Sequence, residues 1–258
     1  MSKTLILFDV DGTLTDPRKF IKKNMLEEIK KLKNINDLDI AIVGGSNLDK
    51  QKEQLGNKNL ELFDYIFSEN GLVSLINNNG NLTNFHSNSF QDYLGIKNYE
   101  YLINSCFEKL IELKPPVKTG TFIESRTGMI NVSPVGRNCS QKQREQFFEI
   151  DKTNKYREDL IKFLKDKWIN LQNNSEREVP NLSFSIGGQI SVDIFPEGWD
   201  KTYCLQFIKD KYDRILFFGD KTSEGGNDYE IFSNPLTEAY TVESPEDTIK
   251  VLNELFNI

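Results

Sequence analysis

The chain has 258 residues, of which 38% are hydrophobic and 28% are charged, a composition typical of globular proteins rather than disordered or fibrous ones. Its net charge is −7, and this acidic balance argues against nucleic acid and anionic membrane surfaces as partners. No apolar segment approaches the roughly 20 residues of a membrane-spanning helix, and the apolar run near the N-terminus is too short for a secretory signal.

The first third of the chain alternates between predicted strands and helices. The apolar run at 4–9 predicts a short buried strand that ends at an acid-rich turn, and apolar residues at helical spacing predict a helix within 20–34. A second apolar run, at 37–46, closes on Gly-Gly-Ser. It is followed by a predicted helix with Asn47 as its N-cap and Gly56 at its end. A third strand is predicted in FDYIFSENG. This order is typical of a parallel sheet covered on both faces.

The middle of the chain has a different pattern. An asparagine-rich hairpin or linker is predicted first, followed by a mixture of amphipathic helices and hairpins. The hairpin or linker covers 75–85, the helices cover 99–113 and 157–168, and the later hairpins cover 119–134 and 182–195. Hairpins mixed with amphipathic helices indicate a separate α+β unit inserted into the parallel domain.

The alternating pattern resumes near residue 198. We expect a helix at about 201–210, a strand at 214–220, and a further strand in EAYTVE. The last helix is predicted to begin after Ser244, with Pro245 at its first position and Asp247 two residues further on, an arrangement that resembles a capping box.

These elements predict an α/β fold with two parts. The Rossmann-like core, with its parallel sheet, takes residues 1–84 and 198–258. The inserted α+β cap domain takes residues 85–197.

Cysteine and histidine content narrows the chemistry. Three cysteines lie far apart without a CxxC motif, which argues against a disulfide framework or a zinc site, and free thiols suit a reducing cytosol. The single histidine, His86, is expected on the surface or in a linker. Acid–base chemistry must therefore come from carboxylates.

Two of the predicted strands end in acids, Asp9 and Asp220. In an open parallel sheet the ligand crevice lies outside the carboxyl ends of the strands, so these two acids meet there if their strands are neighbours. Asp9 and Asp11 are two residues apart, and an extended backbone directs both side chains the same way. Converging carboxylates suit Mg²⁺, although a single aspartate at such a position usually caps only a strand or a turn.

Two further residues could serve an anionic ligand. Ser46 offers a hydroxyl beside backbone N–H groups at a predicted helix start, a suitable seat for phosphate, although a simple turn explains it equally well. Lys201 lies just before another predicted helix and could neutralise a nucleophile or a phosphate, although a lone lysine usually has no such role.

The motif DVDGTLT resembles the first motif of the haloacid dehalogenase (HAD) superfamily of phosphotransferases. GGS, the Lys201 region and GDKTSEGGND stand where the later motifs of that superfamily are expected. The stretches GTFIESRTGMINVSPVGRNCSQKQR, FSIGGQISVDIFPEGWDK and FFGDKTSEGGNDYEIF are similar to eukaryotic-type phosphomannomutases, and the similarity covers nearly the whole chain. The resemblance implies a HAD core with an inserted cap that contributes substrate specificity and dimerisation.

The resemblance also assigns roles to core residues. Asp9 would be the nucleophile that forms an aspartyl phosphate, and Asp11 would be the general acid and base. Asp9, Asp11 through its backbone carbonyl, and Asp220 would hold Mg²⁺. Asp228 would orient the site, and Lys201 would be a catalytic residue.

Substrate contacts are implied in both parts of the chain. Ser46 and Arg18 would bind substrate from the core side, and guanidinium groups of the cap would bind a phosphate. The further implied contacts, three arginines for phosphate and two residues for sugar hydroxyls, are Arg126, Arg137, Arg144, Ser191 and Asp193.

The sequence departs from the family pattern at two places. Asn234 stands where the family often has an acid, in a loop that would hold a possible second cation together with Phe232 and Thr237. The stretch at 168–184 is longer than usual, and we interpret it as a surface loop without a functional role.

The resemblance implies a cytoplasmic homodimer, joined through the cap, that interconverts mannose 6-phosphate and mannose 1-phosphate. A hexose 1,6-bisphosphate would be its activator, and its product would feed GDP-mannose synthesis and protein glycosylation. One alternative is a Mg²⁺-dependent sugar-phosphate phosphatase of the same superfamily, and another is a preference for glucose phosphates, as in a phosphoglucomutase. A third alternative is a non-catalytic sensor or scaffold, but such a protein would need neither Asp9 nor Asp11.

Overall fold

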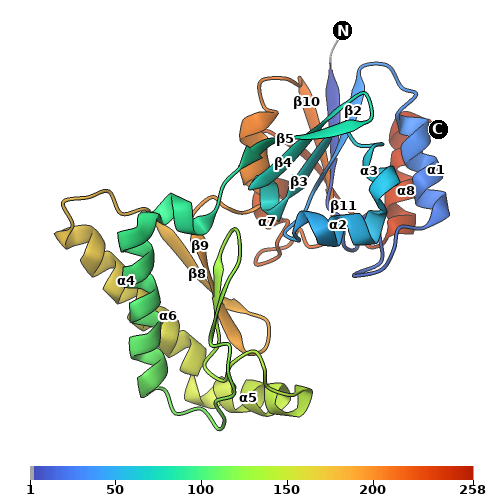
Figure 1. The fold of residues 1–258 in the computed structure, drawn as a ribbon. Helices are drawn as coiled ribbons and strands as arrows, with labels where there is room; N and C mark the ends of the chain where they lie inside the picture. Colours follow the sequence, from blue (N-terminus) through green and yellow to red (C-terminus); the bar gives the residue numbers. More distant parts are fainter. Residues whose placement is uncertain (1–2, 258) are drawn as a thin grey trace. The chain divides into compact units, whose positions relative to one another are not determined.

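The computed structural model describes residues 3–257 and divides into two compact units (Figure 1). The core unit runs to Ser87 and resumes at Gly198, and the cap unit is Asn88–Glu197. The sequence had placed these boundaries after residues 84 and 197. Within the described residues, no helix combines the length and the apolar character needed to cross a bilayer.

The core unit is a sheet with helices on both faces (Figure 1). Its first elements are β1 (Thr4–Phe8), α1 (Lys23–Leu32), β2 (Leu38–Val43), α2 (Leu48–Leu55), α3 (Asn57–Leu60), β3 (Tyr65–Ser68), the 3₁₀ turn η1 (Glu69–Gly71), β4 (Val73–Asn78) and β5 (Asn81–Ser87). After the cap unit it continues with η2 (Lys201–Phe207), β10 (Arg214–Gly219), α7 (Tyr229–Phe232), β11 (Glu238–Thr241) and α8 (Pro245–Phe256).

The strands of the core sheet confirm the predicted parallel arrangement. Within the described residues the order is β11-β10-β1-β2-β3-β4-β5, and the first five of these strands run parallel. The asparagine-rich segment, left open as a hairpin or a linker, forms the antiparallel hairpin β4–β5 at the sheet edge. Asn79 and Gly80 at its tip both have positive φ, of 54° and 85°, as tight hairpin turns require.

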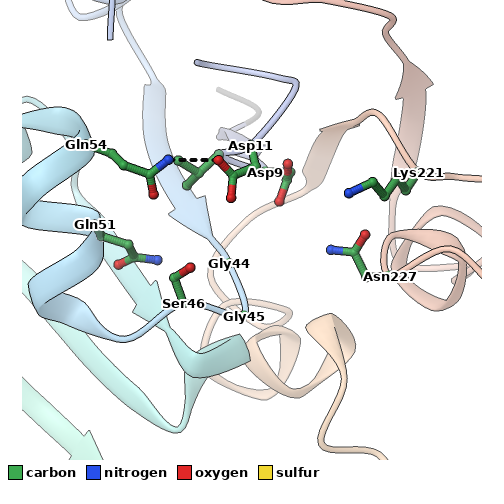
Figure 2. Close-up of a pocket in the computed structure, with 10 residues that line it drawn as sticks. Asp9, Asp11, Gly44, Gly45, Ser46, Gln51, Gln54, Lys221 and Asn227 are labelled. Atoms are coloured by element: carbon green, nitrogen blue, oxygen red, sulfur yellow. Dashed lines mark hydrogen bonds between the residues drawn. The ribbon is translucent and has the colours of Figure 1, made fainter. Parts of the chain in front are cut away.

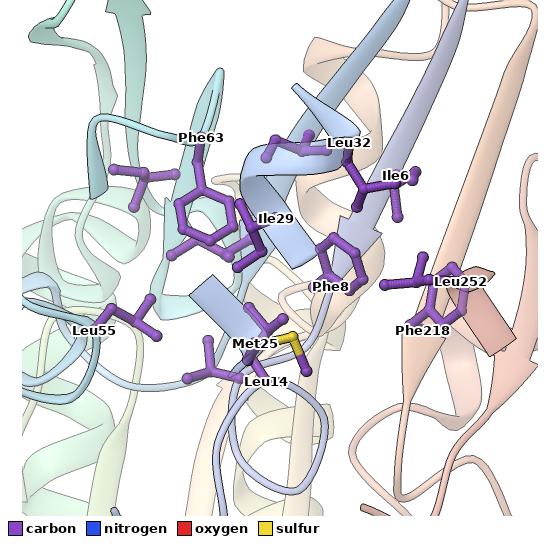
Figure 3. Packing of buried hydrophobic residues seen from close by; sticks show 14 of the residues in the cluster. Ile6, Phe8, Leu14, Met25, Ile29, Leu32, Leu55, Phe63, Phe218 and Leu252 are labelled. Carbon is purple, nitrogen blue, oxygen red and sulfur yellow. The ribbon is translucent and has the colours of Figure 1, made fainter. Parts of the chain in front are cut away.

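Strands β1, β2, β3 and β10 are buried on both faces, which explains why they read as continuous apolar runs. Ile6 and Phe8 of β1 pack with α1, α2, α3 and α8 on one face (Figure 3). Leu5 and Leu7 pack on the other face with η2 and α7. Alternate residues of one strand therefore belong to two separate hydrophobic clusters, and the strand end between them is held firmly in place.

Predicted helix ends are confirmed at several positions. The Asn47 side chain accepts a hydrogen bond as the N-cap of α2, and Gly56 ends that helix with a φ of 84°. Ser244 caps α8 by accepting from the backbone N–H of Asp247 at 3.2 Å. The Asp247 carboxylate reaches back to the N–H of Glu243 at 3.1 Å, one residue before the cap itself. The helix predicted at 201–210 is instead the shorter 3₁₀ helix η2.

The cap unit is an antiparallel sheet with helices, as predicted. Its elements are α4 (Phe90–Glu112), β6 (Ile123–Ser125), β7 (Ile130–Val132), α5 (Gln141–Asn154), α6 (Tyr156–Asn174), β8 (Leu182–Gly187) and β9 (Ser191–Pro196), with strand order β6-β7-β9-β8. The two predicted hairpins, β6–β7 and β8–β9, are confirmed.

Two parts of the cap differ from the sequence analysis. Helix α5 was not predicted, although Ser140 begins it with a capping box to Gln143. The stretch at 168–184, interpreted as a loop, starts inside α6 and then forms the beginning of β8. Trp168 is buried there and donates to the carbonyl of Pro180 at 2.8 Å, so the first part of this stretch belongs to the packed interior.

The cysteines are buried inside the fold, and the single histidine is half-buried. Cys106, Cys139 and Cys204 are buried free thiols. His86 was expected on the surface or in a linker, but it lies half-buried in β5 with its ring 4.7 Å from the ring of Phe207. The histidine therefore has a packing role in the core unit.

Candidate active site

Neighbouring strand ends bring the predicted acids together. Strands β1 and β10 are parallel partners, and the N–H of Asp9 donates to the carbonyl of Phe218 at 2.9 Å. Carboxylate oxygens of Asp9, Asp220 and Asp228, here called the acid cluster, all lie within 4.8 Å of one another. Gly12 makes room for Asp220, because a Cβ at this glycine would lie 2.3 Å from an Asp220 carboxylate oxygen.

A buried lysine sits between two members of the acid cluster. Lys201 donates from Nζ to carboxylate oxygens of Asp9 and Asp228, and its side chain is only 1% exposed. The second oxygen of Asp228 accepts from the backbone N–H of Lys221 at 3.0 Å. Buried charges are tolerated only when they are paired and hydrogen-bonded, and this network meets that condition.

Burial and charge shift the pKa values of these groups. Burial is the main reason that the pKa of Asp9 is raised to about 6, while Lys201 opposes that rise. Burial lowers the pKa of Lys201, but the two neighbouring carboxylates outweigh this effect and raise it overall. The pKa of Asp220 is raised by burial and by Asp228, with Lys221 opposing. Three carboxylates around one ammonium group therefore leave an excess of negative charge.

The donor set of the acid cluster fits a magnesium ion. Mg²⁺ prefers oxygen ligands and takes one or two carboxylates together with waters and phosphate. The sequence analysis named Asp9, Asp11 and Asp220 as ligands, and the side-chain cluster in the structure contains Asp228 in place of Asp11. The backbone carbonyl of Asp11, the ligand atom that the family resemblance implies, stays a prediction.

The Asp11 side chain is held apart from the acid cluster by two donors. Its Oδ1 accepts from Nε2 of Gln54 and from the backbone N–H of Arg18, both at 2.7 Å. The Gln54 bond is the dashed line in Figure 2. Asp9 thus belongs to the acid cluster, whereas the Asp11 carboxylate is oriented by two N–H donors. This division suits two different chemical roles for Asp9 and Asp11.

A pocket opens beside these two acids (Figure 2). It is lined by Asp9, Val10, Asp11, Gly44, Gly45, Ser46, Gln51, Gln54, Lys221 and Asn227. Figure 2 shows Ser46, Gln51 and Gln54, from the β2–α2 region, across the opening from Lys221 and Asn227 of the loop after β10. The predicted phosphate seat at Ser46 therefore lies in the same pocket as both acids.

The sequence analysis did not identify the two glutamines of this pocket. Gln51 is fully buried and accepts from the Ser68 hydroxyl at 2.6 Å, and Gln54 is 3% exposed. Their signal in the sequence is the spacing of three residues, which places both amides on one face of α2.

Two other predicted groups have a weaker relation to the pocket. Arg18 is exposed with a φ of 61°, and its backbone N–H reaches Asp11, whereas its side chain is not among the pocket-lining groups. In the possible second cation loop, the Thr237 hydroxyl donates to the carbonyl oxygens of Ile231 and Asn234 at 2.6 and 3.0 Å. The Asn234 side chain accepts from the N–H of Leu236. Hydrogen bonds within the loop therefore hold Asn234 and Thr237 in place, and a second cation there stays a prediction.

The three predicted arginines of the cap gather in one place, here called the arginine cluster. Glu124 bridges two of them, because its two carboxylate oxygens accept from Nε of Arg126 and Nε of Arg137, each at 2.6 Å. The third, Arg144, donates from Nη2 to the backbone carbonyl of Arg137 at 2.7 Å. Guanidinium groups oriented in this way can present their remaining N–H groups to an anion.

A buried asparagine joins the arginine cluster to the two predicted sugar contacts. Asn131 donates from Nδ2 to Ser191 at 2.8 Å and to Asp193 at 2.5 Å, and its Oδ1 accepts from Arg137 at 2.7 Å. The sequence analysis missed both Asn131 and Glu124. A polar residue inside the apolar run of a strand was the available signal for Asn131.

The chain is similar to known proteins over nearly its whole length. Residues 25–258 match the family profile described as eukaryotic phosphomannomutase. A curated phosphomannomutase of Galdieria sulphuraria is 49% identical over 255 residues, which cover 99% of this chain and 95% of that protein. A phosphomannomutase of Schizosaccharomyces pombe is 47% identical over 260 residues, with coverage of 99% and 95%.

A solved structure of lower identity supports the fold. The trehalose-6-phosphate phosphatase of Aspergillus fumigatus (crystal form 3) superposes with a TM-score of 0.61 at 14% identity, covering 99% of this chain and 93% of that one. This likeness confirms the HAD-type α/β fold with a mainly parallel sheet. The match of the family profile and the two close relatives together show that the chain belongs to the eukaryotic phosphomannomutase family.

Proposed function

We propose that this protein is a phosphomannomutase that interconverts α-D-mannose 1-phosphate and D-mannose 6-phosphate through an aspartyl phosphate and a hexose 1,6-bisphosphate. The close relatives carry the name of this activity over nearly their whole length. One observation carries the proposal: the chain offers two separate places for a phosphate. They are the pocket beside the acid cluster and the arginine cluster of the cap. A bisphosphate intermediate needs a place for each phosphate.

Asp9 is the proposed nucleophile. Its carboxylate oxygen attacks phosphorus of the bisphosphate, the bond from phosphorus to the sugar oxygen breaks, and the phosphoryl group passes to Asp9. Lys201 holds one Asp9 oxygen and favours the ionised form that attack requires. When bound by Asp9, Asp220 and the backbone carbonyl of Asp11, Mg²⁺ would offset the repulsion between the anionic nucleophile and the phosphate. Asp228 supports this site by fixing Lys201.

Asp11 is the proposed general acid and base. It gives a proton to the departing sugar oxygen, and it takes a proton from the hydroxyl that later attacks the aspartyl phosphate. Gln54 and the N–H of Arg18 both donate to Oδ1 of Asp11. Within residues 3–257, Oδ2 accepts no hydrogen bond and is available for the transfer.

The arginine cluster is proposed to bind the phosphate that does not react. Ser191 and Asp193 would contact sugar hydroxyls, since Asn131 ties both of them to Arg137. Arg18 and Ser46 would contact substrate from the core unit. The aspartyl phosphate must also be kept from water while the sugar intermediate turns over, and we assign that task to the cap.

A stoichiometric assay separates the mutase from a phosphatase of the same fold. With mannose 1-phosphate, Mg²⁺ and a trace of glucose 1,6-bisphosphate, we expect mannose 6-phosphate to form in step with substrate loss. Release of inorganic phosphate at the rate of substrate loss would show a phosphatase instead. Activity should disappear with EDTA and return with Mg²⁺. A parallel run with glucose 1-phosphate measures the sugar preference.

We further propose a homodimer joined through the cap. Helix α4 carries exposed apolar side chains at Ile96, Phe107 and Ile111, which are 79%, 50% and 72% exposed. A second copy of the chain would cover this stripe. Light scattering should give twice the mass of one chain, and Phe107→Asp with Ile111→Asp should give the monomer mass. A monomer from the unsubstituted chain would contradict this part of the proposal.

The proposed cellular setting follows from the proposed reaction. The enzyme would act in the cytoplasm, where its product would feed GDP-mannose synthesis and protein glycosylation. Location of a fluorescently tagged chain, with a mannose-phosphate assay on the cytosolic fraction, tests this setting.

A further inference from the structure

The turn η1 contains three consecutive residues in the left-handed region. Glu69, Asn70 and Gly71 have φ values of 48°, 64° and 109°. Residues other than glycine rarely adopt positive φ, because this conformation is strained for residues that carry a Cβ. Strain of this kind persists only where the surrounding structure holds it in place. The contacts of this turn therefore indicate what it stabilises.

On one side the turn holds the loop after β2. The N–H of Glu69 donates to the carbonyl of Ser46 at 3.0 Å, and the N–H of Asn70 donates to the carbonyl of Gly44 at 2.9 Å. Gly44 and Ser46 both line the pocket beside Asp9. Consecutive N–H groups of a left-handed turn thus fix the backbone of the proposed phosphate seat.

On the other side the same turn holds the segment that carries Lys201. The Asn70 side chain donates from Nδ2 to the carbonyl of Trp199 at 3.1 Å, just before the lysine. Gly71 packs against Cys204, three residues after Lys201, because a Cβ on Gly71 would lie 3.0 Å from Cα of Cys204. The lysine is therefore bracketed on both sides by contacts with η1.

We propose that Asn70 is a positioning residue, which sets the Lys201 segment and the phosphate loop after β2 at a fixed distance from each other. Its backbone N–H holds one of them and its side-chain amide holds the other. Asn70 touches neither the reacting atoms nor the acids, and it acts through Lys201 and the loop at Gly44–Ser46. Asparagine suits the position because it tolerates positive φ and also donates from its side chain.

The test compares the same substitution at two positive-φ asparagines. Asn70→Gly keeps the turn conformation accessible and removes only the bond to Trp199. Asn79→Gly, at the exposed tip of the β4–β5 hairpin with a φ of 54°, is the matched control. A displacement of about 1 Å in a catalytic group can cost on the order of 10²-fold, so we expect Asn70→Gly to lower kcat ~10-fold or more. KM and the thermal midpoint should stay close to those of the control.

A second variant removes the same donor without a change of size. Asn70→Asp also tolerates positive φ, and its carboxylate cannot donate to the Trp199 carbonyl, so kcat should fall at least as far as in Asn70→Gly. A kcat equal to that of the control in both variants, or a change in KM alone, would overturn the inference.

Hydrogen exchange gives a readout that does not need activity. Amides in peptides covering 199–207 should exchange faster in Asn70→Gly than in Asn79→Gly, because this segment loses its bond from the Asn70 side chain. Peptides covering 44–46 should change less, because the backbone N–H groups of residues 69 and 70 still hold that loop. Unchanged exchange in the peptides covering 199–207 overturns the inference. The kinetic test rests on the proposed function, whereas the exchange test does not. An unsubstituted protein without mutase activity therefore refutes the function, and the exchange comparison then decides this inference alone.

Discussion

The acid cluster and the arginine cluster both hold opposite charges in contact, but water reaches them to very different extents. Lys201 and Asp228 are 1% and 0% exposed in the core, whereas Arg126 and Arg137 are 40% and 27% exposed in the cap. A buried ion pair cannot exchange one partner for water without a large cost. A half-exposed pair can exchange a carboxylate for another anion at little cost.

This difference shows how one chain can combine buried ion pairs that stay intact with exposed pairs whose carboxylate a phosphate can replace. In the core, Lys201 favours the ionised form of Asp9, the proposed nucleophile. The cap pairs hold the guanidinium groups in position and still leave them able to meet a phosphate. Four substitutions test this contrast, from the largest expected effect to the smallest.

Asp9→Asn should abolish turnover and leave the fold intact. The amide cannot form the phosphoryl bond, and loss of a nucleophile typically costs on the order of 10⁴-fold or more in kcat. A coupled mutase assay measures turnover, and circular dichroism measures folding. Asp49→Asn, at a 91% exposed carboxylate of α2, is the control and should retain full activity. Turnover retained in Asp9→Asn would reject the nucleophile assignment.

Lys201→Met should strongly destabilise the core unit. Two buried carboxylates lose their partner, and breaking a buried pair costs about 3–5 kcal/mol. Arg126→Met, which breaks the exposed pair with Glu124, should cost less than about 1 kcal/mol. Urea denaturation without Mg²⁺ measures both free energies of unfolding. Similar losses for the two variants would remove the basis of the contrast between core and cap.

Arg137→Ala should weaken substrate recognition without unfolding the cap. The substitution removes a guanidinium that contacts both Glu124 and Asn131. Truncation of a charged contact costs about 2–5 kcal/mol when the contact is buried and less when it is partly exposed. We therefore expect kcat/KM to fall by one to two orders of magnitude. Arg177→Ala, on an exposed loop of the same unit, serves as the control. An unchanged kcat/KM would contradict the assigned role.

Glu124→Gln should have the smallest effect. Its carboxylate repels an incoming phosphate, but it also orients two arginines, and glutamine keeps an acceptor for one of them. We expect KM to fall less than about 5-fold, with stability changed by less than about 1 kcal/mol. Steady-state kinetics at low and high salt measure this change, which salt should diminish. A KM that rises tenfold would show that orientation outweighs repulsion.

The parts of the fold that the sequence predicted are those with a local signal. Buried parallel strands read as continuous apolar runs, and a run that ends in an acid places that acid at the ligand edge of the sheet. The sequence alone therefore predicted that Asp9 and Asp220, which are far apart in the chain, lie close together in the fold. The caps at Asn47 and Ser244 were equally visible, because a capping side chain bonds to its own helix.

The parts that the sequence missed depend on partners far away in the chain. Gln54, Asn131 and Asn70 are ordinary polar residues until the fold supplies Asp11, Arg137 and Trp199 as their partners. Helix α5 escaped because it buries only one large apolar side chain, Phe147, so its sequence shows little periodicity. The roles of such residues depend on tertiary contacts, which a local sequence pattern does not contain.

The buried cysteines divide between the two units, with Cys204 in the core and Cys106 and Cys139 in the cap. Burial raises the pKa of Cys106 to about 12 and also raises that of Cys204, so both thiols stay protonated and unreactive while their surroundings are folded. Alkylation by iodoacetamide then requires local opening. Mass spectrometry of peptides alkylated over time would thus report separately how often each unit opens, with no engineered cysteine.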